Sequence, residues 1–334
     1  MTGDHLPGGV RRRAVLGTTA GLTTLAGIGP LAGCGADGRP VRADAPALPP
    51  PQPGIVTIPP AALLLAAYDL TVTDRSTLAG LLRRLTARVT ATRQSGSPTG
   101  LTVTLAVGAS LFDGRFGLAD RRPEALTTMP AFPNDVLDPG RCHGDLLVQV
   151  CAAQADLTRA VEEDLRRSAG DGLRVRWRIG GFRPENGTNI DGNPSTRNLF
   201  GFREGAGNPD AGDDALMRRL VWVDRGDGGP EWTQGGTYQV VRLIRMATAL
   251  WNADPPAQQE AIFGRHRDSG APLGHGREGQ SFGYTDDPEG RMIRLDAHIR
   301  RADPRTRRPP TVASCGAVTR TGSRPTPPVT PTRG

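Results

Sequence analysis

Residues 173–179 read Leu-Arg-Val-Arg-Trp-Arg-Ile, with an apolar side chain at every second position. Successive side chains of a β-strand point to opposite faces of its sheet, so this period of two predicts a strand. Its apolar side chains are expected to face the interior and its arginines the solvent. The same alternation predicts four further strands, at residues 101–107, 145–151, 238–245 and 297–300.

Helical spacing separates these strands. In residues 74–92, leucines 78, 81, 82 and 85 fall on one face of a helix, and Asp74 stands where an N-cap is needed. Further helices are predicted at residues 155–169 and near residues 245–251. Because strands and helices mix without a strict β-α-β order, the pattern favours an α+β fold with antiparallel sheets.

The charge distribution argues against a nucleic-acid partner. Residues 1–53 carry five arginines and three aspartates, and residues 305–334 carry six arginines and no acidic residue. The net charge of +7 therefore comes from the two ends, and the segment between them shows no cluster of cations for phosphates. A nucleotide cofactor also lacks support, because there is neither a G-x-G-x-x-G segment after a strand nor a Walker loop.

The N-terminus predicts export. An arginine run at residues 11–13 is followed by Ala-Val-Leu and a mildly apolar stretch, the pattern of a twin-arginine signal. The stretch ends Leu-Ala-Gly-Cys34, which resembles a lipoprotein cleavage site, so residues 1–34 are predicted to be a signal with Cys34 as the lipidated residue. The alternative is a plain signal peptide with an incidental cysteine. Both interpretations of the signal predict localisation in the cell envelope.

The segments that flank the body differ from it in composition. Residues 35–53 are rich in proline and alanine, which predicts a stiff extended tether. Residues 306–334 are rich in threonine, arginine and proline and hold no acidic or aromatic residue. Such a stretch buries too little apolar surface to offset its ordering entropy, so it is predicted to be a disordered, aberrant tail. No run after the signal is apolar for the roughly 18 residues that a membrane span needs.

Two residues stand out as candidates for chemistry. Glu204 lies in the glycine-rich segment Asn198-Leu-Phe-Gly-Phe-Arg-Glu-Gly-Ala-Gly-Asn-Pro209, where a backbone can approach a flat ligand and a carboxylate can relay a proton. The same residues also suit a simple surface turn. His298 lies in a predicted strand, where a single histidine is more often structural than a ligand. The cysteines form no C-x-x-C pair, and Cys142 and Cys151 are too far apart along one strand for a disulfide.

The order of several motifs resembles the dye-decolourising peroxidases over residues 54–305, in particular the exported subgroup that includes deferrochelatase/peroxidases. The segment 198–209 is similar to the family's G-x-x-D-G segment, and residues 294–305 are similar to its proximal-histidine segment. Further likenesses lie at residues 110–116, 129–135 and 232–246.

The resemblance implies two ferredoxin-like halves, at residues 54–195 and 196–305, with haem b held mainly by the second, which is expected to be incomplete. His298 would be the proximal iron ligand, and Arg305 could pair with a propionate. The residues expected to lie against haem are Gly205, Ala206, Gly207, Asp303, Pro304 and Arg305.

The implied activity is oxidation of dyes or phenols by hydrogen peroxide, and it extends to release of iron from haem. Glu204 replaces the family's distal Asp and keeps the carboxylate that moves a proton between the peroxide oxygens. Hydrogen peroxide, a small organic reductant and haem are the implied partners. Membrane contact is expected only through the signal or lipid anchor, and a homo-oligomer is left open.

One departure from the family pattern concerns the C-terminal end. The family's distal arginine segment has no counterpart in residues 312–321, where the chain reads Val-Ala-Ser-Cys-Gly-Ala-Val-Thr-Arg-Thr. The sequence therefore suggests that the chain after about Arg305 is out of frame or truncated. On that interpretation two alternatives arise: a haem-binding exported lipoprotein with little peroxidase activity, or a non-functional truncated product.

Overall fold

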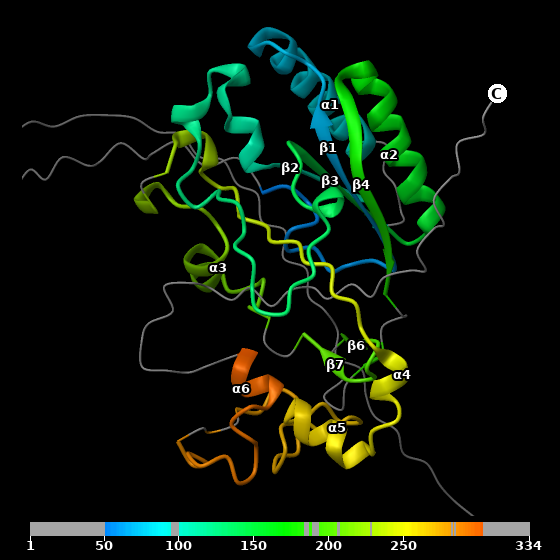
Figure 1. Ribbon diagram of the computed structural model, residues 1–334, viewed down its shortest axis with the longest axis vertical. Helices are drawn as coiled ribbons and strands as arrows, with labels where there is room; N and C mark the ends of the chain where they lie inside the picture. The colour runs from blue at the N-terminus through cyan, green and yellow to red at the C-terminus, as the bar shows by residue number, and fades with distance from the viewer. Residues whose placement is uncertain are drawn as a thin grey trace, which may run out of the picture. The chain divides into compact units, whose positions relative to one another are not determined.

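The computed structural model describes residues 51–94, 100–183, 187–188, 194–205, 208–227, 229–281, 283 and 285–302. Residues 62–182 form an antiparallel sheet with two helices on one face (Figure 1). The strands are β1 (Ala62–Leu70), β2 (Thr102–Val107), β3 (Leu146–Ala152) and β4 (Leu173–Phe182), in the order β2-β3-β1-β4. The helices are α1 (Arg75–Gln94) and α2 (Ala155–Ala169). This βαββαβ order is ferredoxin-like, and the predicted α+β class with antiparallel sheets is confirmed.

Strand β1 lies at the centre of the sheet. It pairs with β3 on one side and with β4 on the other, and eight of its nine residues are buried. Alternate residues of this strand face opposite sides of the sheet and belong to two separate layers of packing. Leu64, Ala66 and Tyr68 belong to the core under the helices, while Leu63 and Leu65 pack on the opposite face. A strand buried on both faces needs apolar residues throughout, which is why this one shows no alternation.

The helices cover one face of the sheet with the predicted apolar stripes. Leu78, Leu81, Leu85 and Val89 of α1 are buried, at the three- and four-residue spacing of one helix face. The side chain of Asp74 caps α1 as expected, because its Oδ1 accepts the backbone N–H groups of Ser76 and Thr77, each at 2.9 Å. The helices predicted at 74–92 and 155–169 and the strands predicted at 101–107, 145–151 and 173–179 are confirmed to within a few residues.

Arg178 of β4 is exposed, as expected of the arginines of this strand, but its guanidinium also reaches a buried partner. Its Nη2 lies 2.9 Å from Oε1 and 2.8 Å from Oε2 of Glu162, a residue of α2 that is fully buried. The hydroxyl of the buried Tyr68 donates to the same Oε1. Burial, followed by the hydrogen bond to Glu162, raises the pKa of Tyr68, so the phenol stays protonated. A buried carboxylate, with its two donors, therefore ties α2 to β1 and β4.

A long connection links β2 to β3 and contains four short 3₁₀ turns: η1 (Ala109–Phe112), η2 (Gly114–Phe116), η3 (Ala119–Arg121) and η4 (Pro139–Arg141). Arg115 fastens it to the sheet. Its Nη1 and Nη2 donate to the two carboxylate oxygens of the buried Asp145 at 3.1 and 2.8 Å, and Asp145 also accepts the backbone N–H of Leu70 at 2.8 Å. This ion pair belongs to the 110–116 motif and has a structural role.

The remaining described elements are short. After η5 (Gly170–Gly172), a small antiparallel sheet contains β5 (Gly187–Thr188), β6 (Pro194–Arg197) and β7 (Arg203–Glu204) in that order. The elements that follow are α3 (Asp214–Leu220), η6 (Arg225–Asp227), η7 (Glu231–Thr233), α4 (Thr248–Trp251), α5 (Pro256–Phe263) and α6 (His298–Ala302). Helices α5 and α6 pack on each other (Figure 1).

Two predicted strands are wrong. Residues 238–245 form no β-ladder with any described strand; instead the side chain of Gln239 bonds to Gln149 and Arg242 pairs with Asp135. Residues 298–300 fall in the helix α6, which contains arginine and alanine, residues that favour a helix. Four residues are too few for their alternation to distinguish a strand from a helix. The helix predicted near 245–251 is present but is limited to α4.

Several predictions concern residues outside the described part of the chain. They are the signal with Cys34, the tether up to residue 50, and the tail at 306–334. Within the described part, no helix is both long and apolar enough to cross a bilayer. Cys142 and Cys151 form no disulfide with each other, as their spacing predicted.

Candidate functional site

Aromatic side chains from three separate segments gather next to α6. Aromatic residues make up only 4% of the chain, so their concentration here is selective. Phe202 stacks on Phe263 with ring centroids 3.9 Å apart and planes 4° from parallel. Trp251 meets the ring of Phe263 edge-on, with centroids 5.5 Å apart. Its ring is tilted against that of Phe200, with centroids 4.7 Å apart. We call these four residues, Phe200, Phe202, Trp251 and Phe263, the aromatic cluster.

The turn that presents Phe200 and Phe202 is fixed by Asn198. Its Oδ1 accepts the backbone N–H groups of Phe200 at 3.0 Å and Phe202 at 3.1 Å, and its own N–H donates to the Phe202 carbonyl at 2.8 Å. Gly201 has a φ of +83°, a conformation that glycine adopts without strain. The turn therefore joins β6 to β7 and directs two phenyl rings to one place.

His298 is the first residue of α6, and its imidazole packs against the aromatic cluster. The centroids of the His298 and Phe263 rings are 5.3 Å apart, with planes tilted by 58°. The residue is exposed as a whole, yet partial burial of the ring lowers its pKa, and the positive charge of Arg265 lowers it further. Among the described residues the imidazole has no hydrogen-bond partner. The lowered pKa favours the neutral form of this imidazole, the form in which a ring nitrogen can bind a metal.

An ion pair holds the segment that carries His298. Arg300, two residues along, donates from Nη2 to the Asp287 carboxylate at 2.6 Å and from Nε to the Ile293 carbonyl at 2.7 Å. Asp287 also accepts the backbone N–H groups of Ile293, Met292 and Arg291. These hydrogen bonds lower the pKa of Asp287, and the bond from Ile293 has the largest effect. The carboxylate thus stays ionised and braces both ends of the segment 287–300.

Gly264 sets the distance between α5 and α6. It closes α5 with a φ of +77°, and a Cβ at this position would lie 2.9 Å from Cγ2 of Ile293 and 2.9 Å from Cγ1 of Ile299. We expect Gly264→Ala to lower the free energy of unfolding by about 2–4 kcal/mol, the sum of left-handed backbone strain and overpacking. Urea unfolding measures this loss, and displacement of α6 should also weaken ligand binding at His298.

The matched control for that substitution is Gly117→Ala. Gly117 also has a positive φ, +61°, but a Cβ added there would meet no atom within 4 Å. Only the backbone cost of about 1–2 kcal/mol is expected there. Equal losses in the two variants would contradict the packing role of Gly264.

Polar side chains hold the loop after α5 against β6 and β7. Arg265 donates to the carbonyls of Gly270 at 2.7 Å and Glu278 at 3.0 Å. The buried Glu278 accepts a bond from the hydroxyl of Ser195 at 3.2 Å. Arg197 and Arg203 donate to backbone carbonyls of the same loop at Asp268, at 3.1 and 3.0 Å. The Arg265 charge is therefore fixed in place on the His298 side of the loop.

The structure brings the two candidate segments to one cluster. Glu204 is half-buried at the end of β7, opposite Thr196 of β6, and lies two residues from Phe202. Phe202 in turn stacks on Phe263, which contacts His298. Gly205 follows with a φ of +102° and is exposed. The other candidates lie outside the described residues: Ala206, Gly207, Asp303, Pro304 and Arg305.

The aromatic cluster, the fixed Arg265 charge and the Asp287–Arg300 pair were not predicted. The contacts of the aromatic cluster join residues as far apart as Phe200 and Phe263, so no local pattern reveals them. The signal that could have found the cluster is the scarcity of aromatic residues, which makes Phe200, Phe202, Trp251 and Phe263 conspicuous. No group of three or more His, Cys, Asp or Glu side chains in the described residues could hold a bare metal ion.

Comparisons with known proteins agree with these segments. Residues 52–183 match the family model "Dyp-type peroxidase, N-terminal", and residues 195–310 match "Dyp-type peroxidase, C-terminal". The second match runs past Arg305. The interpretation of the end of the chain as truncated or out of frame is therefore not borne out.

Among curated proteins, the chain is 41% identical over 277 residues to a deferrochelatase of Escherichia coli (strain K12), covering 76% of this chain and 66% of that protein. The chain thus spans about two thirds of the length of this relative. Among solved structures, it is similar to a DyP-type peroxidase from Cellulomonas bogoriensis, with a TM-score of 0.69 and 35% identity over 79% of this chain and 75% of that one. It is also similar to ferric DtpA from Streptomyces lividans, with a TM-score of 0.67 and 34% identity over 76% and 72% of the two chains.

Proposed function

The chain belongs to the Dyp-type peroxidase family, and on that premise we propose that it is a haem-dependent peroxidase that oxidises dyes or phenols with hydrogen peroxide and also releases iron from haem. Haem is the cofactor of this family. The observation that carries the proposal for this chain is His298: a neutral imidazole without a described hydrogen-bond partner, on a braced segment beside an aromatic cluster.

The residues present fit a haem group. Iron takes a neutral imidazole nitrogen as a ligand, and the lowered pKa of His298 favours that form. The half-buried ring of Phe263, which the buried Phe202 backs on one face, offers flat apolar surface near this ligand. Gly205 follows Glu204, and because it has no side chain, a flat ligand can approach its backbone closely. We assign His298 as the proximal ligand, and Gly205, Ala206, Gly207, Asp303, Pro304 and Arg305 as the residues against the haem.

Glu204 is assigned as the acid–base group for peroxide. Cleavage of the O–O bond to two water molecules consumes two electrons and two protons from the reductant, and one proton must first move from one peroxide oxygen to the other. A carboxylate within hydrogen-bond reach performs that transfer. When bound, haem supplies the redox chemistry of the reaction. The carboxylate of Glu204 and the imidazole of His298 supply the proton transfer and the ligation.

The relatives' name, deferrochelatase, supports iron release as a second activity. In that reaction the iron leaves the porphyrin and two protons take its place. We also propose export by the twin-arginine route with a lipid on Cys34, supported by the arginine run at 11–13 and the Leu-Ala-Gly-Cys segment. No finding favours the alternatives of a haem-binding lipoprotein with little peroxidase activity or a non-functional product.

Two assays on the full chain loaded with haem test the proposal. The first follows loss of absorbance of an anthraquinone dye on addition of hydrogen peroxide, and the expected rate is far above that of the same concentration of free haem. The second follows porphyrin fluorescence, which rises when iron leaves haem because the iron no longer quenches it. Dye oxidation at the rate of free haem would contradict the peroxidase proposal, and absence of porphyrin fluorescence would contradict iron release.

A further inference from the structure

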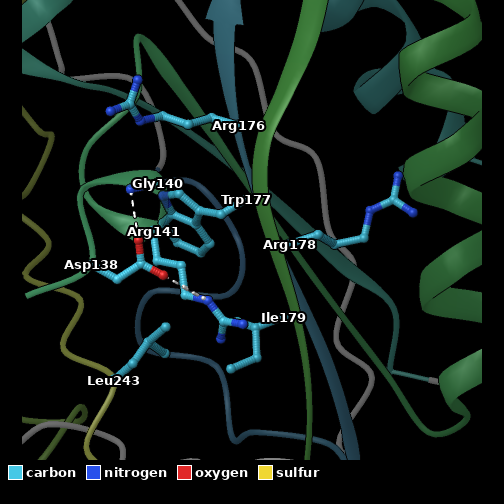
Figure 2. Close-up of a pocket in the computed structure, with 8 residues that line it drawn as sticks. All are labelled: Asp138, Gly140, Arg141, Arg176, Trp177, Arg178, Ile179 and Leu243. Carbon is cyan, nitrogen blue, oxygen red and sulfur yellow. Dashed lines mark hydrogen bonds and ion pairs between the residues drawn. The ribbon is translucent and has the colours of Figure 1, made fainter. Parts of the chain in front are cut away.

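A cavity of about 330 Å³ lies on the face of the sheet opposite α1 and α2 (Figure 2). Strand β4 forms one wall through Trp177 and Ile179, the turn at Asp138–Arg141 forms another, and Leu243 closes a third. Neither His298 nor Glu204 lines it. Its volume is at the lower end of the range for small-molecule sites, enough for a molecule of one or two rings.

The apolar part of the cavity comes mainly from Trp177 and Ile179 of β4. Trp177 and Ile179 alternate along β4 and so point to the same side of the sheet, where they pack with Leu63, Leu65 and Val241. The indole N–H of Trp177 donates to the carbonyl of His143 at 2.8 Å, which fixes the ring and occupies its polar edge. What Trp177 offers to the cavity is therefore the flat face of an aromatic ring.

Of the three arginines that line the cavity, two are committed elsewhere. Arg178 points away from it towards α2, where it pairs with Glu162 (Figure 2). Arg176 donates to the carbonyls of Cys142 at 2.6 Å and Pro139 at 3.1 Å, and pairs with Asp69 at 3.2 Å. Arg176 therefore holds the turn at Asp138–Arg141 in place and adds positive charge to the cavity. Most of its N–H groups already bind these partners.

Arg141 differs from both. Its side chain forms an ion pair with Asp138 at 3.4 Å, in which both side chains are 62% exposed. Exposed pairs of this kind contribute at most about 1 kcal/mol, so the contact is easily exchanged for another anion. The carboxylate of Asp138 also has a second partner, the backbone N–H of Gly140 at 2.9 Å. Most of the five N–H donors of the Arg141 guanidinium therefore remain for a ligand.

We propose that this cavity is a binding site for a planar aromatic anion, with its carboxylate or sulfonate on the Arg141 guanidinium and its ring on the face of Trp177. A guanidinium matches a carboxylate through two parallel hydrogen bonds, and an aromatic ring stacks on an indole face. The site does not depend on the proposed peroxidase function, because none of its residues belongs to the haem site.

The test is isothermal titration calorimetry of the full chain with 2-naphthoate, compared with the neutral 2-naphthamide. Arg141→Gln is expected to weaken naphthoate binding at least tenfold and to leave the weak naphthamide binding unchanged, because a charge-assisted two-point contact is lost. The control is Arg159→Gln, which removes an exposed arginine paired with Asp156 on α2 and should leave the naphthoate affinity unchanged.

A second variant separates this cavity from the haem site. His298→Ala should bind 2-naphthoate with wild-type affinity, and binding should quench tryptophan fluorescence in both proteins. Equal affinity of the wild type for naphthoate and naphthamide would overturn the proposal, as would undiminished naphthoate binding to Arg141→Gln or absence of binding at millimolar concentrations.

Discussion

His298→Ala is expected to bind haem at least about 100-fold more weakly than the wild type, and to oxidise dye no faster than free haem. Removal of groups that merely orient a metal ligand already costs about 10–100-fold in metal affinity, and here the ligand itself is removed. Titration with haem, followed at the Soret band, measures the loss. Added imidazole should restore part of the band, because a free ligand can enter the space that the side chain leaves.

The control for this variant is His266→Ala. His266 is half-buried and follows α5, but its Nδ1 lies 3.3 Å from Oε2 of Glu260, so it is already engaged with a carboxylate. This variant should keep the wild-type haem affinity. If it lost haem as fully as His298→Ala did, the effect would be one of folding, and the assignment of His298 as the ligand would fail.

Arg178→Ala is expected to lower the free energy of unfolding by about 3 kcal/mol, because it leaves the fully buried Glu162 without its cation. The expected loss is near the lower limit for a broken buried pair, since the Arg178 side chain is itself 37% exposed and water can reach it. Urea unfolding monitored by circular dichroism gives the value. Arg159→Ala removes an exposed pair on the same helix and should cost at most about 1 kcal/mol.

A second substitution identifies the cause of that loss. Glu162→Gln removes the negative charge but keeps an oxygen that can accept the hydrogen bond from Tyr68. If the buried charge is responsible, the double variant Glu162→Gln with Arg178→Ala should be more stable than Arg178→Ala alone. A double variant that is less stable would instead show that packing of the Arg178 stem is the main contribution.

Local patterns predicted the elements whose side chains have one buried and one exposed face. The leucine spacing of α1 reflects such faces. The strands at 101–107 and 145–151 were predicted from the alternation of their residue types, although none of the residues of β2 or β3 is exposed. The central strand β1 was not predicted, because it is buried on both sides and reads as an unbroken apolar run. Residues 238–245 alternate as a strand does, but a strand also needs a neighbour to pair with, which local patterns do not specify.

The candidate site divides in the same way. Family motifs identified Glu204 and His298 as the residues of interest, although the predicted strand around His298 is a helix in the structure. The contacts of Phe263 with His298 and Phe202, and of Arg300 with Asp287, depend on tertiary packing between segments distant in sequence. Such contacts carry no periodic signal. The family motifs therefore supply candidate residues, whereas the surroundings that set the pKa and position of His298 come from tertiary packing.

The most direct test of the central claim is resonance Raman spectroscopy of the ferrous, haem-loaded full chain, in which an iron–imidazole bond has its own stretching band. We predict one haem per chain and an iron–imidazole band in the wild type, and loss of that band in His298→Ala while His266→Ala retains it. An unchanged band in His298→Ala would contradict the assignment of the ligand, and a soluble wild-type chain that takes up no haem would contradict the proposed function as a whole.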